Sequence, residues 1–279
     1  MVERFLRPTS AAEALQMQRE TGGLFLAGGT ELNWGGPATA RVLISLEGLP
    51  LGAVAQQGGF VTLGSTCSLQ QLADDRSLGR AGLGLLVEAA RAVGSRAVRG
   101  QATLGGNVAS NKSCSDLLPS LMVLGAELLL ATDAGDQVVP VEQYVAAPTK
   151  GALITGVRVP LPGAAMRAAR ERFSRTVNDL ATLNVAVSLQ AQPGAIAEPR
   201  VAVGGVAATV ERLAPVEAAL RAMKPGGATE WGDRLRKAVR DAVKPIDDLR
   251  GSAAFKTHLA EELCVRAVAA CLAPQGGAR

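Results

Sequence analysis

Two short stretches of the chain gather residue types that bind anionic groups. The first is LFLAGGTEL, residues 24–32, and the second is ATLGGNVASNKSCSD, residues 102–116. Glycines leave consecutive backbone N–H groups uncovered, and such a concavity attracts anions, with hydroxyl and amide groups as further donors. The residues concerned are Gly28, Gly29, Thr30, Thr103, Gly105, Gly106 and Asn107. Each stretch alone is equally typical of an ordinary turn, but two of them suit the two sides of a dinucleotide pyrophosphate.

A carboxylate follows the second stretch. Asp116 lies nine residues after Asn107, at the start of the apolar segment 116–124. A carboxylate against phosphate is unfavourable, whereas a ribose or ribityl hydroxyl can donate a hydrogen bond to it. The alternative is that Asp116 caps the helix that the apolar run predicts.

Two further polar segments lie in the second half of the chain. Residues 170–181, RERFSRTVNDLA, place three arginines near Asn178 and Asp179, and a solvated basic strand is the alternative to a functional role. Residues 245–267 hold a D-x-R-G-S turn with Asp248, Arg250 and Ser252, followed by a helix. We expect this turn to be an ion-pair and capping cluster or an interface, without a catalytic role.

Several classes of chemistry lack the residues that they need. The single histidine, His258, is expected at the surface of a helix and makes a Ser-His-Asp triad improbable. The four cysteines contain no C-x-x-C pair, which indicates a reduced chain without a disulfide framework, zinc site or cluster site. We expect Cys114 to be a buried or neutral loop residue. Neither a G-x-G-x-x-G fingerprint after a strand nor a Walker loop is present.

The overall composition favours a packed globular protein. The chain has 279 residues, of which 48% are hydrophobic and 19% charged, with a net charge of +4. Scattered basic residues and 3% aromatic residues make nucleic-acid binding a weak hypothesis. The N-terminus lacks the apolar core of a signal peptide, and no run is long enough for a membrane span, so we expect a cytoplasmic protein.

The order of the predicted elements divides the chain into two parts. Strand and helix signals alternate up to residue 162, as in an α/β domain, and 163–172 is a candidate boundary. Beyond it, 180–208 predicts two long strands around a Pro-Gly turn, and helices are predicted at 209–223, 230–243 and 254–272, as in an α+β domain. In the first part, helices are predicted at 10–20, 82–93 and 116–124, and a hairpin at 126–145 turns at 133–136.

Taken together, these segments resemble the FAD-binding medium subunit of the xanthine dehydrogenase and carbon monoxide dehydrogenase family, the molybdenum hydroxylases. LAGGTEL resembles that family's first FAD loop, and T-L-G-G-N followed by S-D-L-x-P resembles its second. ALITGVRVP (152–160) resembles the strand that closes the flavin domain, and D-L-R-G-S-A-A-F-K matches the family's C-terminal motif.

The resemblance implies a fold and a set of cofactor residues. It implies a two-part FAD-binding domain of PCMH/VAO type over 1–165, followed by a smaller α+β domain over 170–275 with an antiparallel sheet and helices. Asp116 would take a FAD hydroxyl, Arg175 would lie where some members place a Lys beside the flavin, and no catalytic or metal-binding residue is implied. The implied FAD-binding residues are Phe25, Leu26, Ala27, Gly28, Gly29, Thr30, Glu31, Leu32, Val93, Thr103, Gly105, Gly106, Asn107, Asp116, Ile154 and Arg175.

The resemblance also implies partners. A large subunit would hold molybdopterin, a small subunit would carry two [2Fe–2S] clusters, and FAD in this chain would pass their electrons to NAD or another acceptor. The assembly would be a dimer of heterotrimers. FAD would be non-covalent because no His lies near the first loop, and no [4Fe–4S] cluster is expected because the flavin part has only Cys67 and Cys114.

Three features depart from the family pattern. NKSC replaces the usual small apolar residues after G-G-N, the loop between the first glycine stretch and 41–49 is short, and aromatics are scarce. The flavin ring is then either open to solvent or covered by partners. Two rival interpretations remain: a stand-alone flavin-dependent reductase or oxidase of the same fold, and an assembly module that has lost FAD.

Overall fold

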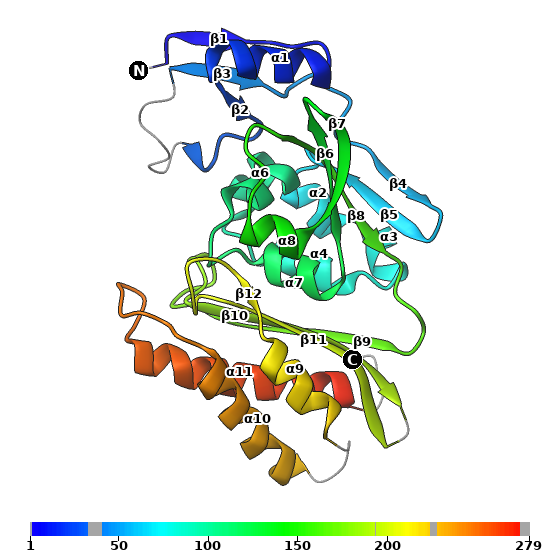
Figure 1. Ribbon diagram of the computed structural model, residues 1–279, viewed down its shortest axis with the longest axis vertical. Helices are drawn as coiled ribbons and strands as arrows, with labels where there is room; N and C mark the ends of the chain where they lie inside the picture. Colours follow the sequence, from blue (N-terminus) through cyan, green and yellow to red (C-terminus); the bar gives the residue numbers. More distant parts are fainter. Residues whose placement is uncertain (1, 33–40, 193, 224–227, 274–279) are drawn as a thin grey trace. The chain divides into compact units, whose positions relative to one another are not determined.

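The computed structural model describes residues 2–32, 41–192, 194–223 and 228–273, and separates them into two compact units (Figure 1). Unit 1 comprises residues up to 111 together with 125–161, and unit 2 comprises 112–124 together with the chain from 162 onward. The predicted short loop before residue 41 falls on 33–40, outside the described residues. The second glycine stretch is therefore divided, because Thr103–Asn107 belong to unit 1 and Asp116 belongs to unit 2.

Unit 1 begins with a small parallel sheet and a helix. The strands β1 (Arg4–Leu6), β3 (Val42–Ser45) and β2 (Leu24–Leu26) lie in the order β1-β3-β2. Helix α1 (Ala11–Thr21) begins at Ser10, whose hydroxyl accepts a hydrogen bond from Glu13 N at 3.1 Å. The Glu13 carboxylate in turn accepts hydrogen bonds from the backbone N–H and the hydroxyl of Thr9, both at 2.6 Å. Ala14, Leu15 and Ile44 form the centre of this core.

The second sheet of unit 1 is antiparallel and has five strands in the order β4-β5-β8-β6-β7. The predicted hairpin is confirmed, and its two strands are joined by a turn at residues 133–134. The hairpin is shorter than predicted, because residues 141–146 form a helix and not the end of the second strand. The strands are β4 (Val54–Gln57), β5 (Phe60–Gly64), β6 (Glu127–Thr132), β7 (Gly135–Pro140) and β8 (Leu153–Pro160).

Short helices complete unit 1, and one of them corrects the sequence interpretation. Residues 104–110 were expected to form a loop, but they form helix α6 (Leu104–Ser110). Thr103 caps it by accepting from Gly106 N at 3.2 Å, which stabilises a first turn that two glycines disfavour. The other helices are α2 (Leu69–Asp74), α3 (Arg76–Arg80), α4 (Gly84–Arg91), α5 (Arg96–Gln101) and α8 (Val141–Ala146).

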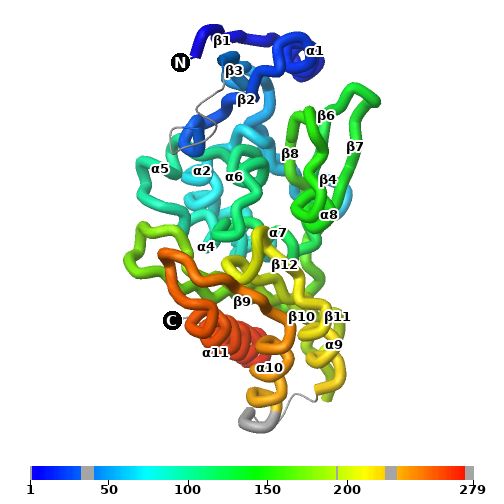
Figure 2. Tube along the Cα trace, turned by 60° about the vertical axis from the view of Figure 1, so that its left-hand side comes forward, coloured from blue at the N-terminus to red at the C-terminus, as the bar shows by residue number. Residues whose placement is uncertain are grey.

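Unit 2 is built on a four-stranded antiparallel sheet in the order β12-β11-β10-β9 (Figure 2). The strands are β9 (Met166–Phe173), β10 (Leu183–Gln192), β11 (Ala195–Gly204) and β12 (Glu211–Arg212). Most of the segment 163–172, which was expected to be a boundary, belongs to strand β9. The eight residues of β9 pair with β10, from Leu183↔Phe173 to Gln190↔Met166. This pairing stabilises the strand, which the side-chain pattern of MRAARERF does not predict.

Helices cover both faces of this sheet. Leu183, Val185 and Val187 of β10 belong to the core that α9 (Ala214–Arg221), α10 (Ala228–Ala242) and α11 (Ala253–Leu272) form with the sheet. Alternate residues of a strand point to opposite faces, and Ser188 O–H donates to the Val123 carbonyl at 2.7 Å on the other face. Helix α7 (Leu117–Val123) therefore packs on the face opposite α11. This two-sided cover explains why residues 183–189 are all buried.

Candidate functional site

The first glycine stretch leaves the parallel sheet as a loop with uncommitted donors. Strand β2 ends where Leu46 N donates to Leu26 O at 2.8 Å. Within the part of the chain that the structure describes, the backbone N–H groups of Gly28, Gly29 and Thr30 have no acceptor. Gly29 has a φ of +68°, in the left-handed region that favours glycine. The loop thus presents consecutive half-buried N–H groups, as the sequence predicts.

The two glycine stretches meet within unit 1. A Cβ atom added to Gly28 would overlap the carbonyl oxygen of Gln101, so the backbone of the first loop lies directly against the residue pair Gln101–Ala102. Only glycine permits this approach. Thr103 follows immediately, which brings the predicted donors of both stretches to one region of unit 1.

The second stretch uses its glycines differently from the prediction. Its backbone N–H groups were expected to be exposed, but Leu104 N donates to Cys67 O at 2.9 Å and Gly105 N donates to Ser65 O at 2.8 Å. A Cβ on Gly105 would stand 2.6 Å from the Cβ of Ser65. The glycine therefore serves close packing of backbone on backbone. The groups of this stretch that stay predicted for a ligand are the Thr103 hydroxyl, which already accepts from Gly106 N, and the Asn107 amide.

Ser65 is a residue that the sequence analysis missed. It follows β5, is buried, and its hydroxyl has no hydrogen-bond partner among the described residues. A buried hydroxyl without a partner is unfavourable and invites a bound polar group. A single Ser after a strand carries no signal in the sequence, and only its contact with Gly105 connects it to the site.

The remaining predicted residues of unit 1 have different settings. Phe25 and Ala27 are partly buried against the core of the N-terminal sheet. Leu26, Glu31 and Leu32 are half-buried in or just after β2. Val93 follows α4 and is half-buried, and its carbonyl accepts from Arg99 Nη1 at 3.1 Å. Ile154 is buried within β8.

Asp116 in unit 2 is the centre of a buried ion-pair cluster. Its Oδ1 accepts from Arg170 Nη2 and from Arg172 Nε, both at 2.9 Å, and all three side chains are largely buried. It forms no side-chain cap on α7, so the capping alternative is wrong. Burial raises the pKa of the Asp116 carboxyl, and the two guanidinium groups oppose that shift. The alternative of a solvated basic strand is also wrong, because Arg170 and Arg172 point into this cluster.

Arg172 connects the cluster to the loop that follows β9. It donates to the Ser174 hydroxyl and to the Asp179 carbonyl as well as to Asp116. Arg175, in that same loop, has a side chain that is 70% exposed and lies 4.0 Å from the Asp179 carboxylate. The structure therefore places Arg175 at the surface of unit 2, paired with Asp179, and its predicted place beside the flavin stays a prediction.

The D-x-R-G-S turn of unit 2 is a capping and ion-pair cluster, as expected. Ser252 caps α11 by accepting from Phe255 N at 3.2 Å. The ion-pair partner of Asp248 is the fully buried Lys256, at 2.7 Å, and Lys256 also donates to the Ile246 carbonyl at 2.8 Å. The side chain of Arg250 is not part of that pair.

Other candidate chemistry finds little support in the described residues. All four cysteines are buried and free, and burial raises the pKa of the Cys114 thiol. His258 is exposed, as predicted. Over residues 2–32, 41–192, 194–223 and 228–273, no group of three or more His, Cys, Asp or Glu is placed to hold a metal ion. No helix in these same ranges has the length and apolar character that crossing a bilayer requires.

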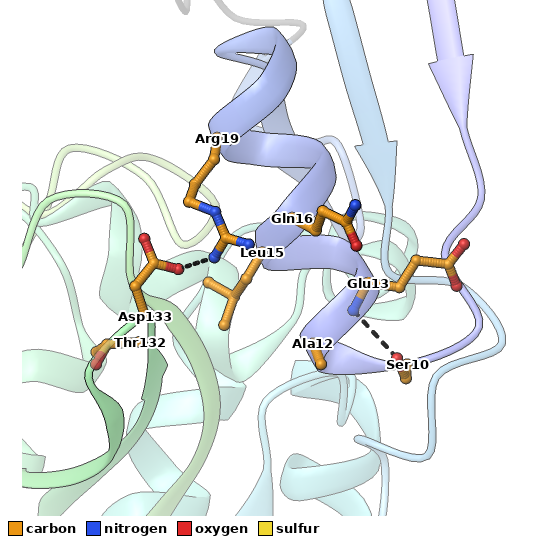
Figure 3. A pocket seen from close by; sticks show the side chains of 8 residues that line it. All are labelled: Ser10, Ala12, Glu13, Leu15, Gln16, Arg19, Thr132 and Asp133. Atoms are coloured by element: carbon orange, nitrogen blue, oxygen red, sulfur yellow. Dashed lines mark hydrogen bonds and ion pairs between the residues drawn. The ribbon is translucent and has the colours of Figure 1, made fainter.

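An open groove of about 510 Å³ lies between α1 and the β6–β7 turn (Figure 3). Its charged groups already have partners. Arg19 forms an ion pair with Asp133 across the groove, and the Glu13 carboxylate accepts a hydrogen bond from Thr9 N. None of the predicted cofactor residues lines this groove. It therefore does not correspond to the site predicted from the glycine stretches.

Comparison with protein families decides the relationship. The model described as the FAD binding domain in molybdopterin dehydrogenase matches residues 1–162, and the model of the CO dehydrogenase flavoprotein C-terminal domain matches 168–271. The chain belongs to the family of FAD-binding medium subunits of the molybdenum hydroxylases. Membership confirms the predicted family and oxidoreductase class, and the first of the two models is that of a FAD-binding domain.

Individual relatives agree with the family. The Escherichia coli (strain K12) protein YgfM is 33% identical over 274 residues, which cover 97% of each chain. The carbon monoxide dehydrogenase medium chain of Hydrogenophaga pseudoflava is 26% identical over 240 residues, covering 83% of this chain and 82% of that one. A solved structure of the Hydrogenophaga pseudoflava enzyme, in a form lacking the Mo-pyranopterin moiety, superimposes with a TM-score of 0.91 over 97% of both chains at 26% identity. The predicted fold class is thereby confirmed.

Proposed function

We propose that this chain binds FAD non-covalently in unit 1 and serves as the electron-transfer subunit of a heteromeric molybdenum-containing hydroxylase or dehydrogenase. The observation that carries the proposal is the first glycine loop. Its three N–H groups at Gly28–Thr30 have no acceptor among the described residues, and it abuts the segment that leads into Thr103. Unused donors in the first loop, and a buried, unpartnered Ser65 hydroxyl next to Gly105 of the second stretch, fit an anionic, hydroxyl-rich dinucleotide.

Each part of the site has a separate task in this proposal. Gly28, Gly29 and Thr30 donate to the pyrophosphate, and Thr103 and Asn107 face it with a hydroxyl and an amide. Phe25 to Leu32 also line the adenosine side, and Val93 and Ile154 contact the flavin through apolar surface. Asp116 and Arg175, which both lie in unit 2, are assigned to a FAD hydroxyl and to the flavin ring by the family resemblance alone. Bound FAD supplies the electron chemistry, and the protein supplies position and electrostatics.

The partners follow from the family. The names of the relatives, carbon monoxide dehydrogenase medium chain and nicotine 6-hydroxylase medium subunit, describe proteins that are one chain of a larger enzyme. We infer that this chain takes electrons from [2Fe–2S] clusters of a small partner subunit. A large subunit holds the molybdopterin and oxidises the substrate, and the acceptor is NAD or another oxidant.

A single methyl group tests the FAD site. Gly28→Ala places a Cβ onto the Gln101 carbonyl oxygen and forces the two stretches apart, so we expect a loss of FAD affinity of at least a hundredfold. Gly100→Ala is the matched control. Gly100 lies in α5, one residue from Gln101, and a Cβ there meets nothing within 4 Å. Affinity is measured by titrating FAD into the apoprotein and following the quenching of flavin fluorescence.

Three outcomes separate the alternatives. Retained affinity in Gly100→Ala together with loss in Gly28→Ala supports the proposed site. Equal affinity in both variants and the wild type places FAD elsewhere. A wild-type chain that binds FAD and transfers electrons from a reductant without any partner chain supports the stand-alone reductase or oxidase instead.

A further inference from the structure

The exposed apolar side chains of unit 2 are confined to one place. Among the described residues of this unit, the large hydrophobic side chains exposed to solvent are Val177, Leu180, Ile246, Leu249 and Phe255. We name these five residues the end patch. Leu249 is 97% exposed, Val177 85% and Ile246 72%, the three highest values among the described large hydrophobic residues. Single exposed apolar residues are normal, but these five come from two loops and one helix turn and together form a patch. Contiguous apolar patches of this kind are typical of protein–protein interaction sites.

The segments that carry the end patch are neighbours in space. The loop 174–181 follows β9, and the loop 244–252 leads into α11. Phe173 at the end of β9 contacts Phe255 in the first turn of α11, with ring centroids 5.6 Å apart in an edge-to-face arrangement. Figures 1 and 2 show the two loops side by side at the same end of unit 2. The five side chains therefore belong to one surface.

Buried polar groups hold both loops in shape. Arg172 donates to Ser174 and to the Asp179 carbonyl, which spans the first loop. In the second loop, Lys256 binds Asp248 and the Ile246 carbonyl. The apolar side chains are thus presented by ordered backbone, and a preorganised surface loses less conformational entropy when it binds.

The charges around the end patch select the kind of partner. Lys244 and Arg250 flank Ile246 and Leu249 and form no ion pair with any described residue. The nearby carboxylate of Asp248 is already engaged by Lys256, and that of Asp247 accepts from Ala253 N. A surface with an apolar centre and carboxylates at its rim would complement this pattern. A second copy of this chain would not, because a two-fold contact sets the patch against itself and brings Lys244 and Arg250 towards like charges.

We propose that the end patch is the docking surface for the iron–sulfur chain of the same enzyme, and that the matching surface of that chain has an apolar centre and an acidic rim. The inference rests on the proposed function, which supplies such a chain, and adds the place where it binds. Val177 and Leu249 are the central contacts, and Lys244 and Arg250 provide the electrostatic match at the rim.

The test uses the full complex. A tagged chain is purified from its native host, FAD is quantified from its absorbance, and the co-purifying chain is identified by its mass and its iron–sulfur absorbance. The double variant Val177→Asp/Leu249→Asp keeps FAD and loses at least tenfold of the partner chain. The matched control is Val54→Asp/Val138→Asp, which alters two exposed valines of unit 1 and leaves the partner at the wild-type level.

Each other outcome overturns a specific statement. A patch variant that retains both FAD and its iron–sulfur partner refutes the docking surface and leaves the proposed function intact. A wild-type chain that self-associates, in a manner that the patch variant abolishes, assigns the surface to a second copy. A wild-type chain that carries no FAD refutes the proposed function itself.

Discussion

Removing the Asp116 carboxylate should destabilise unit 2 strongly, because two cations depend on it. Asp116 is 6% exposed, and the Arg170 and Arg172 side chains are 12% and 13% exposed, each with a nitrogen 2.9 Å from Oδ1. Breaking a buried ion pair by deleting one partner costs about 3–5 kcal/mol. Asp116→Ala should therefore lower the free energy of unfolding by about 3–5 kcal/mol. That is a large part of the roughly 5–15 kcal/mol that a domain possesses.

The assay is urea unfolding of the apoprotein followed by circular dichroism, for the wild type, Asp116→Ala, Arg172→Met and the double variant. Because Asp116 and Arg172 share one interaction, the double variant should lose clearly less stability than the sum of the single variants. The exposed pair Lys237–Asp241 in α10 is the control, and Asp241→Ala should change the free energy of unfolding by less than about 1 kcal/mol.

Two results bear on different roles of Asp116. A loss of less than about 1 kcal/mol in Asp116→Ala, or additive effects in the double variant, would refute the ion-pair account. FAD titration of Asp116→Asn under conditions where it is folded tests the role implied by the family. A dissociation constant raised tenfold shows that the carboxylate also takes a FAD hydroxyl, and an unchanged one removes Asp116 from the FAD site.

Two further predictions concern ionisable groups of unit 2. The hydrogen bond from Lys256 lowers the pKa of Asp248 below its ordinary value of 3.8, so this carboxylate stabilises the fold above the unfolded pKa and the contribution disappears as the pH falls through the folded pKa. The stability difference between wild type and Asp248→Asn should thus be constant from pH 5 to 7 and shrink below about pH 4, and a difference independent of pH down to 2 contradicts the pairing. Burial raises the pKa of the Cys264 and Cys271 thiols to about 12, so neither should react with a thiol reagent at pH 8 until urea unfolds the protein. Rapid labelling of the native chain, located by peptide mass, would show that α11 opens.

Local structure was predictable where one residue type determines it. The caps of α1 and α11 follow from Ser10 and Ser252, and the hairpin turn follows from the polar residues at 133–136. Helix α6 was missed because two glycines argue against a helix, while its stability comes from Thr103 and from carbonyls of the 65–67 segment. Strand β4 was also missed, because its four residues are exposed and lack an apolar alternation.

The site could be predicted only in part, because its contacts join residues that are far apart in the sequence. Gly28 and Gly105 were both predicted to leave N–H donors open to a ligand. The structure shows that Gly105 instead donates to the Ser65 carbonyl, and that each glycine permits a close backbone contact, with Gln101 and with Ser65. The partners of Asp116 lie 54 and 56 positions away, on a strand that the sequence suggested was a boundary. The family motif pointed to Asp116 and could not reveal the arginines that bind it.

The most direct test of the central claim is an absorption spectrum of the tagged chain purified gently from its native host, with the accompanying chains identified by mass. The account predicts flavin bands together with broad iron–sulfur absorbance, and two further chains at constant ratio to this one. A chain that is isolated alone, is colourless and binds no added FAD would contradict it, and the unused N–H groups of Gly28, Gly29 and Thr30 would then be only those of a turn.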